Sequence, residues 1–550
     1  MKIATLDLVI IIVYLAGIVG LGCLAGFARR RRGDGNGRAY FLAGRSLSWP
    51  VIGLALFSTN ISTVHLVSLA QEGFDNGLAF GNFEWMAAFV LIILALFFAP
   101  FYMRSRVATL PDFLERRYSR ASRDWLAGMS IVSAVFIHIG FSLYAGAVVL
   151  NSLFGIPILF SIITIALLTG LYTMVGGLLA VVWTESIQTI ILLAGAICIA
   201  AVATVKIGYW NGLVDSVEPV KLTMFRSLDV PAGKPWYWLL LGNSNDSSNL
   251  SWLSIILGYP IIGIWYWCSD QTIVQRVLGA KDENHARVGP LFAGFIKILP
   301  VFIFVLPGLM CYGLIQQGKL PPLADSKQTY SFMISHLLPD GLRGVVAAAL
   351  LAALMSTVSG ALNSIATLFS YDLYKRWRPD TSDARLVTIG RAATFAAMLL
   401  AVAWSPLVGQ FKSIFQGINA MICYIAPPIT VVFVAGVFCR RASSRAAFVT
   451  LVAGSALGAV TFFLDFFKAQ TGWNVHWMMA GFYLAVICSA ILTVVSLIKP
   501  DLSPSPQREA LVWKSPLDAF RGEAWPGLGN YKLLSVLLLA VVIALYVVFG

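Results

Sequence analysis

Apolar runs of about 20 residues recur along the whole sequence, and this recurrence restricts the chain to a membrane fold. A hydrocarbon core about 30 Å thick needs roughly 20 apolar residues for each helical crossing. Hydrophobic residues make up 58% of the 550 positions and charged residues only 12%, whereas soluble domains carry roughly 25% charged residues. We therefore expect an all-α multi-pass membrane protein. The runs predict about fourteen transmembrane helices, at 5–27, 48–72, 78–103, 124–154, 157–175, 179–205, 252–275, 289–316, 341–373, 388–405, 410–438, 445–465, 476–497 and 531–549.

Basic residues gather in alternate loops between these runs. They occur at 29–38, 104–123, 276–287, 375–385 and 440–445, and in the Pro-rich segment 499–530. Because Lys and Arg are retained on the cytoplasmic side of a membrane, this alternation places those loops in the cytoplasm and both termini outside, at the cell membrane. The same sidedness accounts for the net charge of +13 without a nucleic-acid partner.

The sequence carries no signature of an enzyme or of an ATP-driven pump. It has no phosphate-binding loop, no nucleophile–base pair and no cluster of metal ligands. Its seven Cys residues are scattered without a CxxC pair, so neither a disulfide framework nor a metal site is indicated. We expect the cysteines to be small buried side chains.

Charged residues within or at the ends of the apolar runs include Glu84, Glu185, Asp270 and Lys297. A charge there costs roughly 2.5–3.5 kcal/mol and often marks a functional site. Glu84 and Lys297 lie deep within their runs, which favours a functional role. Glu185 and Asp270 lie near expected cytoplasmic ends, and for these two an ion pair at the membrane interface is the favoured interpretation.

Two spanning segments are interrupted. The first contains "STNISTVH" at 58–65, which places five hydroxyl or amide side chains and a histidine inside an apolar run. The second contains "GYPIIGIWYW" at 258–267, punctuated by Gly258, Pro260 and Gly263. Broken spans in matching positions point to the binding site of a transporter, because unwound backbone offers carbonyl oxygens. The alternative, a simple kink in a packed helix, stays open for each segment taken alone.

A small-residue face lies within "AALMSTVSGALNS" at 352–364. Ala353, Ser356 and Thr357 are spaced i, i+3, i+4 and so share one side of a helix. Two hydroxyls beside a carbonyl form an uncharged oxygen surface that suits Na+, yet small residues also mediate helix packing in membranes. The spacing alone favours packing.

Several long motifs resemble the sodium/solute symporter family, in particular its sodium/glucose cotransporter branch, and they span nearly the whole chain. They are "YFLAGRSLSWPVIGLALFSTNIS", "EWMAAFVLIILALFFAPFY", "VGGLLAVVWTESIQT", "WYWCSDQTIVQRVLGAK" and "LNSIATLFSYDLYKRW". The resemblance implies a LeuT-like fold with a core of two inverted five-helix repeats. By this interpretation 1–45 holds an extra helix and a basic loop, 46–250 the first repeat, 251–440 the second, and 441–550 three extra helices with a Pro-rich cytoplasmic linker near 499–530.

The resemblance also implies a sodium site between the first interrupted helix and the small-residue face. Its ligands correspond to the carbonyls of Ser58, Ile61 and Ala353 and to the hydroxyls of Ser356 and Thr357. With the family in view, the face at 353–357 is interpreted as functional. Glu185 stands where two-sodium members have Asp, and Ser359 is a neighbouring hydroxyl, so the resemblance leaves a second sodium site open.

The sugar site of the branch corresponds to seven residues, for which the side-chain chemistry is suitable. Carboxylates accept hydrogen bonds from hydroxyls, and Lys and Asn donate them. Asn419 stands where sugar carriers typically have Gln, so the preferred hexose or polyol stays open. The seven residues are Asn60, His65, Glu84, Tyr266, Trp267, Lys297 and Asn419. The expected gates are Leu69, Phe83 and Phe415 on the outer side and Tyr266 on the cytoplasmic side.

The resemblance predicts sodium-coupled symport of a glucose- or galactose-type hexose by alternating access, in a chain that functions as a monomer in the bilayer. Two alternatives remain. One is another small solute, such as myo-inositol or a monocarboxylate, although Glu84 disfavours an anion. The other is a sugar-gated sensor without coupled transport.

Overall fold

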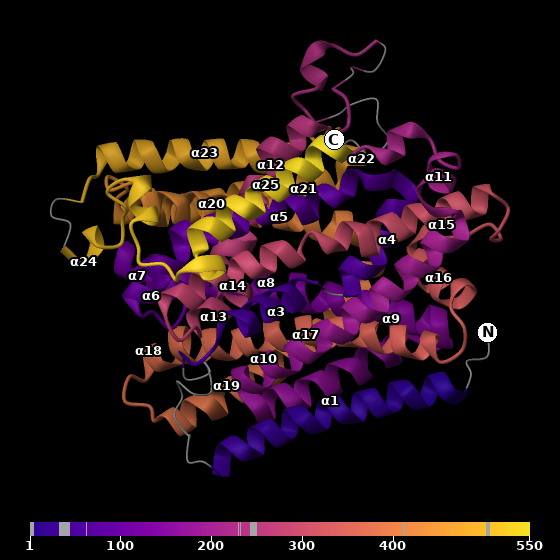
Figure 1. Cartoon of the computed structure of the whole chain (residues 1–550). Coiled ribbons are helices and arrows are strands. Elements are labelled where there is room, and N and C mark those ends of the chain that lie inside the picture. The colour runs from indigo at the N-terminus through magenta and orange to yellow at the C-terminus, as the bar shows by residue number, and fades with distance from the viewer. Residues whose placement is uncertain are drawn as a thin grey trace.

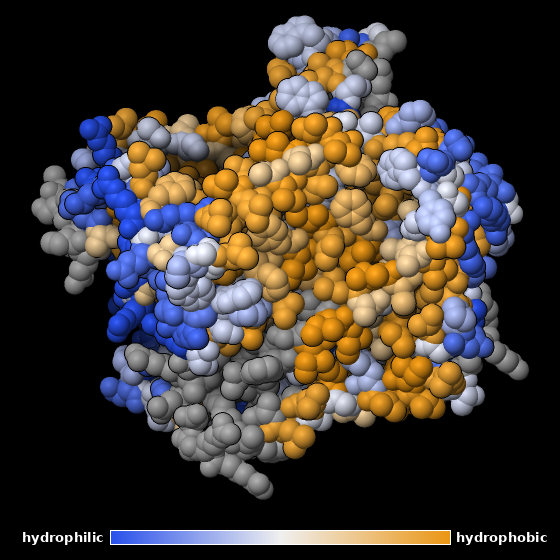
Figure 2. All heavy atoms as spheres, viewed as in Figure 1, coloured by the Kyte–Doolittle hydropathy of each residue, from blue (hydrophilic) through white to orange (hydrophobic). Residues whose placement is uncertain are grey.

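The computed structural model describes residues 5–31, 45–61, 63–228, 230, 233–242, 250–410, 413–501 and 506–550. Helices make up most of this part of the chain. It also contains two isolated β-bridges, Leu47–Ala280 and Arg226–Ser251. Eleven helices in the described ranges are long and apolar enough to cross a membrane. Figure 2 shows a broad apolar band between two hydrophilic ends. The predicted all-α multi-pass class is confirmed.

The predicted apolar runs fall on helices, and the runs 157–175 and 179–205 both lie within α10. Several short helices lie between the runs. In Figure 1, α1 and α10 lie along one edge of the molecule, and α20, α21, α23 and α25 gather at the opposite edge. The helices are α1 (Thr5–Arg31), α3 (Trp49–Asn60), α4 (Thr63–Asn76), α5 (Asn82–Ile93), α6 (Ala99–Ser105), α7 (Leu110–Arg117), α8 (Arg120–Ser133), α9 (Gly140–Phe154), α10 (Ile158–Ile207), α11 (Tyr209–Val214), α12 (Trp252–Ile264), α13 (Gln271–Leu278), α14 (Glu283–Ile296), α15 (Leu306–Gln316), α16 (Thr329–Leu337), α17 (Leu342–Thr367), α18 (Lys375–Trp377), α19 (Asp383–Trp404), α20 (Ile414–Phe438), α21 (Ser444–Phe466), α22 (Lys468–Thr471), α23 (Trp477–Ile498), α24 (Pro506–Glu509) and α25 (Tyr531–Phe549).

In the described part of the chain, five π-helical segments interrupt the long spans, each adding one residue to a helical turn. Two of them, η3 and η8, lie two residues before Pro100 and Pro307 respectively. A proline cannot donate the i to i−4 hydrogen bond of an α-helix, so a local change of hydrogen-bond pattern at these points has a direct cause. The segments are η3 (Leu94–Phe98), η4 (Ala134–Ile139), η7 (Trp265–Ser269), η8 (Val301–Val305) and η10 (Leu368–Tyr374).

The first predicted interruption is present. Helix α3 ends at Asn60, and Ile61 adopts an extended conformation with φ −76° and ψ 97° before α4 begins at Thr63. The side chains before the break compete for backbone groups, as Ser, Thr and Asn do: the Thr59 hydroxyl donates to the Ala55 carbonyl at 2.8 Å. Ser62 lies outside the described residues.

The second interruption is displaced from its predicted position. Pro260 lies inside α12, and the chain leaves helical geometry only at Asp270, with φ −83° and ψ 124°. A proline removes a single donor, and membrane helices absorb that loss through neighbouring groups and π turns. A carboxylate, by contrast, can start a new helix by capping it, and Asp270 accepts from the Thr272 N–H at 2.7 Å. The expectation of a break within 258–263 was therefore wrong.

Helix α1 caps the helix that carries the small-residue face. The buried Asp7 carboxylate accepts from the backbone N–H groups of Gly341 and Gly344 at 2.8 and 2.7 Å. These groups belong to the first turn of α17, whose N–H groups have no partner within the helix. The N-terminal helix therefore fixes the start of α17.

We expect Asp7→Ala to lower the free energy of unfolding by about 2 kcal/mol, because it leaves two buried N–H groups without their acceptor. Asp7→Asn should lose less, since its amide oxygen still accepts. Chemical denaturation of the two purified variants in detergent measures the difference. Equal stability of Asp7→Ala and the parent would contradict the capping role.

The segment predicted as a linker is attached to the body of the protein. Trp513 is buried, its indole N–H donates to the Phe97 carbonyl at 3.1 Å, and its backbone N–H donates to the Val437 carbonyl at 3.0 Å. Arg508 donates to the Tyr118 carbonyl at 2.8 Å. Residues 506–530 therefore pack over the ends of α7 and α20 before α25 begins.

Candidate functional site

A cavity lies among α3, α4, α5, η4, α9, α12, η7, α17 and α20. All seven residues that the sequence predicted for the substrate line it, although they come from widely separated parts of the chain. They are Asn60, His65, Glu84, Tyr266, Trp267, Lys297 and Asn419.

A buried ion pair forms the polar centre of this cavity. Lys297 donates to Glu84 and, at 2.6 Å, to the side-chain oxygen of Asn60, and the side chains of Lys297 and Glu84 are almost fully buried. Glu84 lies in the first turn of α5 and Lys297 follows the last residue of α14. The negative Glu84 thus lies at the N-terminus of α5 and the positive Lys297 at the C-terminus of α14, where each charge interacts favourably with the helix dipole. The fold therefore stabilises a pair that is costly to bury.

The remaining predicted residues surround this pair. Lys297 lies 5.8 Å from the centre of the Trp267 ring. Asn419 lines the cavity, and its side-chain amide donates to the Phe415 carbonyl at 2.8 Å. Tyr266 and His65 keep partial exposure on the cavity wall. The cavity thus combines one charged pair with aromatic and amide groups.

Sequence reasoning missed a second polar region of the cavity, formed by His138 and Ser142. The His138 imidazole is hydrogen bonded to the Asp270 carboxylate at 3.0 Å and packs against Trp265 and Tyr266 with ring centres 6.4 and 5.9 Å apart. Asp270 does have a basic partner, as predicted, but in the interior rather than at the interface. The signal in the sequence was a lone histidine in the apolar run 124–154.

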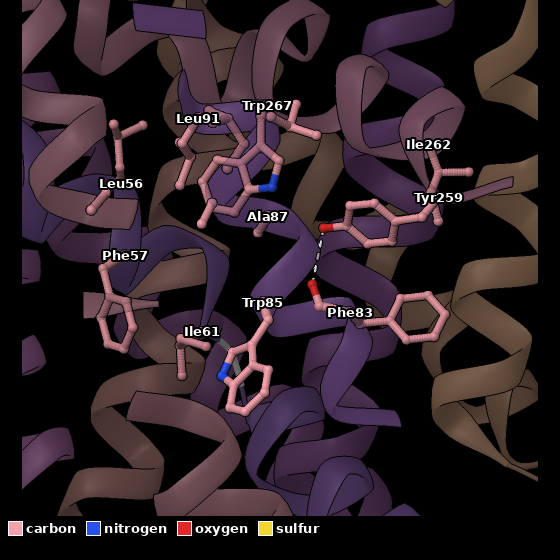
Figure 3. Close-up of a cluster of buried hydrophobic side chains, with 14 of the residues drawn as sticks. Leu56, Phe57, Ile61, Phe83, Trp85, Ala87, Leu91, Tyr259, Ile262 and Trp267 are labelled. Carbon is pink, nitrogen blue, oxygen red and sulfur yellow. Dashed lines mark hydrogen bonds between the residues drawn. The ribbon is translucent and has the colours of Figure 1, made fainter. Parts of the chain in front are cut away.

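Aromatic side chains cluster at the side of the cavity predicted to face outward. Phe83 and Phe415 line the cavity with ring centres 4.9 Å apart, and Phe80 packs on Phe415 at 5.6 Å. The Tyr259 hydroxyl donates to the Phe83 carbonyl at 2.9 Å (Figure 3). Leu69, the third predicted gate residue, is buried on α4 but does not line the cavity.

The predicted sodium ligands converge where α3 meets α17. The Ser356 hydroxyl donates to the Ser58 carbonyl at 2.9 Å, and the Thr357 hydroxyl donates to the Thr59 carbonyl at 3.2 Å. Thr357 also lines the cavity, so this hydroxyl cluster adjoins it. The Ser58 hydroxyl oxygen is buried without a hydrogen-bond partner in the described residues. The cluster therefore offers hydroxyl and carbonyl oxygens without a formal charge.

The other predicted ligands differ in their placement. Ala353 lies one turn before Thr357 on α17, and Ile61 forms the extended link after α3. The Ser359 hydroxyl donates to the Ser356 carbonyl of its own helix at 2.9 Å. Glu185 lies in α10, and its side chain is outside the described part of the chain.

A helical membrane protein that encloses a polar cavity, with uncharged oxygens beside an interrupted helix, has the features of a solute carrier. The model of the Sodium:solute symporter family matches residues 40–454, and the chain belongs to this family. It is thus a sodium-coupled symporter, with Na+ as its coupling ion, and not an enzyme. The resemblance noted in the sequence is confirmed.

Curated relatives include carriers of two solute classes. Sodium/glucose cotransporter 2 of Rattus norvegicus is 33% identical over 540 residues, which cover 91% of this chain and 79% of the relative. Sodium/myo-inositol cotransporter 2 of Oryctolagus cuniculus is 32% identical over 520 residues, which cover 90% and 76%.

Among solved structures, a Na+-coupled sialic acid symporter in a substrate-bound outward-open state matches with a TM-score of 0.75 at 20% identity. The match covers 92% of this chain and 100% of that one. Mhp1, a nucleobase-cation-symport-1 family transporter, matches with a TM-score of 0.53 at 14% identity over 86% and 98% of the two chains. These likenesses show that the fold is shared with sodium- and cation-coupled transporters.

Proposed function

We propose that this symporter carries a neutral polyhydroxylated solute, a glucose- or galactose-type hexose, together with Na+. The observation that carries the proposal is the buried set Glu84, Lys297 and Asn60, which presents acceptors and donors on one cavity wall without net charge. Hydroxyl groups can replace these internal hydrogen bonds pair for pair. Trp267 and Tyr266 supply aromatic surface for the sugar ring, and sodium/glucose cotransporters are among the relatives.

The sodium ion is proposed to bind between α3 and α17. The Ser58 carbonyl and the hydroxyls of Ser356 and Thr357 are its ligands, joined by the carbonyls of Ile61 and Ala353. In the structure the hydroxyls bond directly to carbonyls of α3. A cation between the two helices would replace these bonds, because a hydroxyl can turn its lone pair toward an ion. Sodium binding and the position of the interrupted helix are thereby coupled. Glu185 and Ser359 remain candidates for a second sodium site.

We propose fourteen crossings, of which two fall within α10 and require the chain to reverse direction between the runs 157–175 and 179–205. In this proposal 46–250 and 251–440 form two inverted repeats, with 1–45 and 441–550 as additions. Both repeats begin with an interrupted helix, at Ile61 and at Asp270. The second span of each repeat holds a π segment, η3 or η8, followed two residues later by a proline. The third span of each repeat also contains a π segment, η4 or η10. Matching irregularities of this kind support a repeat.

Both termini are proposed to lie outside, and the monomer is proposed as the functional unit. The start of α1 bonds to Gly341, beside the loop 317–340, and the Phe549 carbonyl accepts from Met224 in the loop 206–250. Both loops lie between the basic loops assigned to the cytoplasm, so the alternation of spans places them outside. The two ends of the chain therefore meet loops of the same predicted side.

Transport follows by alternating access. Sodium holds α3 against α17, the solute enters beneath the open aromatic gate, the gate closes, and the cytoplasmic side around Tyr266 opens. One sodium ion moving through 100 mV contributes about 2.3 kcal/mol, which corresponds to roughly 50-fold accumulation of the solute.

The test is uptake of labelled glucose into proteoliposomes with an imposed sodium gradient. We expect concentrative uptake that is lost when choline replaces Na+. Competition by unlabelled hexoses, myo-inositol and monocarboxylates identifies the solute. Strong competition by myo-inositol alone would support the cyclic-polyol alternative. Sodium current without labelled flux would support a sensor. Uptake that persists in choline would contradict sodium coupling.

A further inference from the structure

A buried carboxylate at the outer end of α4 joins this helix to α20. Glu72 is 1% exposed, and its Oε1 accepts a hydrogen bond at 2.9 Å from the hydroxyl of Ser413, 341 positions further along the chain. Its Oε2 accepts from the Asn76 side chain at 2.6 Å. Both carboxylate oxygens are therefore occupied, one within α4 and the other across the interface between two helices.

The partners of this carboxylate are neutral. In the described ranges it accepts hydrogen bonds from the side chains of Ser413 and Asn76. The nearby Lys221 donates instead to the backbone carbonyls of Phe74 and Asp75, at 3.2 and 2.7 Å, and Arg226 donates to the carbonyl of Asn76. These bonds fix the C-terminal end of α4. Glu72 makes the side-chain contact from this end of α4 to Ser413 at the start of α20.

The position of Ser413 determines the position of the gate. Ser413 is the N-cap of α20 and accepts from the Gln416 N–H at 3.3 Å. Phe415, two residues further on, contacts Phe83 and Phe80 over the cavity. Leu69 lies one turn before Glu72 on α4. A bond between Glu72 and Ser413 therefore connects the two helices that carry predicted gate residues.

We propose that Glu72 is a positioning residue of the outer gate. Its hydrogen bond to Ser413 holds the start of α20 against α4 when the aromatic gate is closed. Opening the gate breaks this bond and hydrates the carboxylate. Burial of a carboxylate with only neutral partners is costly, so hydration offsets the loss of the bond and keeps both positions of the gate accessible. The inference holds for any solute and does not depend on the hexose assignment.

The experiment measures access to the cavity from outside. A cysteine is introduced in place of Ser142, which lines the cavity. The measured quantity is the rate at which a membrane-impermeant thiosulfonate modifies this cysteine. The chain without the introduced cysteine gives the background rate. We expect Glu72→Ala and Ser413→Gly to raise the rate several-fold, because either change removes the bond while Gly still serves as an N-cap. Glu72→Gln keeps an acceptor oxygen but removes the charge whose hydration favours opening, so it should not raise the rate above that of the parent. The double variant should be no faster than the faster single one, since the two residues act through one contact.

The control is Ser326→Ala, which removes the hydroxyl that bonds to Asp75 at 2.9 Å at the same end of α4 without touching α20. It should leave the modification rate unchanged. In transport assays, Glu72→Ala should lower both the half-saturating solute concentration and the maximal rate, because a gate biased open binds readily but closes slowly. An unchanged rate in Ser413→Gly, which leaves α4 intact, overturns the proposal, as does an equal rise in Ser326→Ala.

Discussion

Lys297→Ala is expected to reduce solute uptake at least 100-fold and to lower the free energy of unfolding by about 3–5 kcal/mol, because it leaves Glu84 as an unpaired buried charge. The two side chains form the charged centre of the cavity and are almost fully buried. Uptake in proteoliposomes and denaturation in detergent measure the two effects separately. Glu84→Ala should produce both effects as well.

A neutral double variant separates the structural role of this pair from its binding role. Glu84→Gln/Lys297→Met removes both charges and roughly conserves side-chain volume, and such replacements are often neutral or stabilising. We expect it to fold with stability close to the parent and still to fail in uptake, since the solute has lost its charged hydrogen-bond partners. Normal uptake by this folded double variant would refute the assignment of the pair to the solute site.

Ser356→Ala is expected to raise the sodium concentration for half-maximal uptake roughly 10- to 100-fold, because a hydrogen bond or ligand contact to a charged group contributes about 1.5–3 kcal/mol. Thr357→Ala should act in the same direction. Both hydroxyls bond to carbonyls of α3 at the interrupted helix. The maximal rate at saturating Na+ should fall less than the apparent affinity, since the substitution acts on ion binding.

The control for this measurement is Thr388→Ala, which removes an exposed hydroxyl that donates to the Ala384 carbonyl on α19. It should leave the sodium dependence unchanged. Ser359→Ala tests the second ion: with two sodium sites the Hill coefficient should fall toward one, and with a single site it should not change. An unaltered sodium dependence in both Ser356→Ala and Thr357→Ala would remove the basis of the proposed site.

Polarity in apolar surroundings singled out Glu84, Lys297 and the stretch that contains Asn60, and these three side chains do meet in space. The other predicted cavity residues came from the family resemblance. The second interruption was placed wrongly because Pro260 attracts attention, whereas the capping carboxylate of Asp270 decides where the helix ends. His138 was missed because its role depends on Asp270, 132 positions away, and a pairing at that separation leaves no local pattern.

The π segments carry a consequence for how the chain tolerates changes in length. Each π turn contains one residue more than the α turn it replaces, and successive α-helical residues are rotated by about 100°. Deleting one residue from Val301–Val305 would turn the π segment into an ordinary α turn, so the helix beyond it would keep nearly the same orientation relative to Lys297. Deleting one residue from the α-helical part of α15 would instead turn everything beyond the deletion by about 100° and present the wrong surface to its neighbours. Single-residue changes of length should therefore be tolerated better within the π segments than in the α-helical stretches beside them.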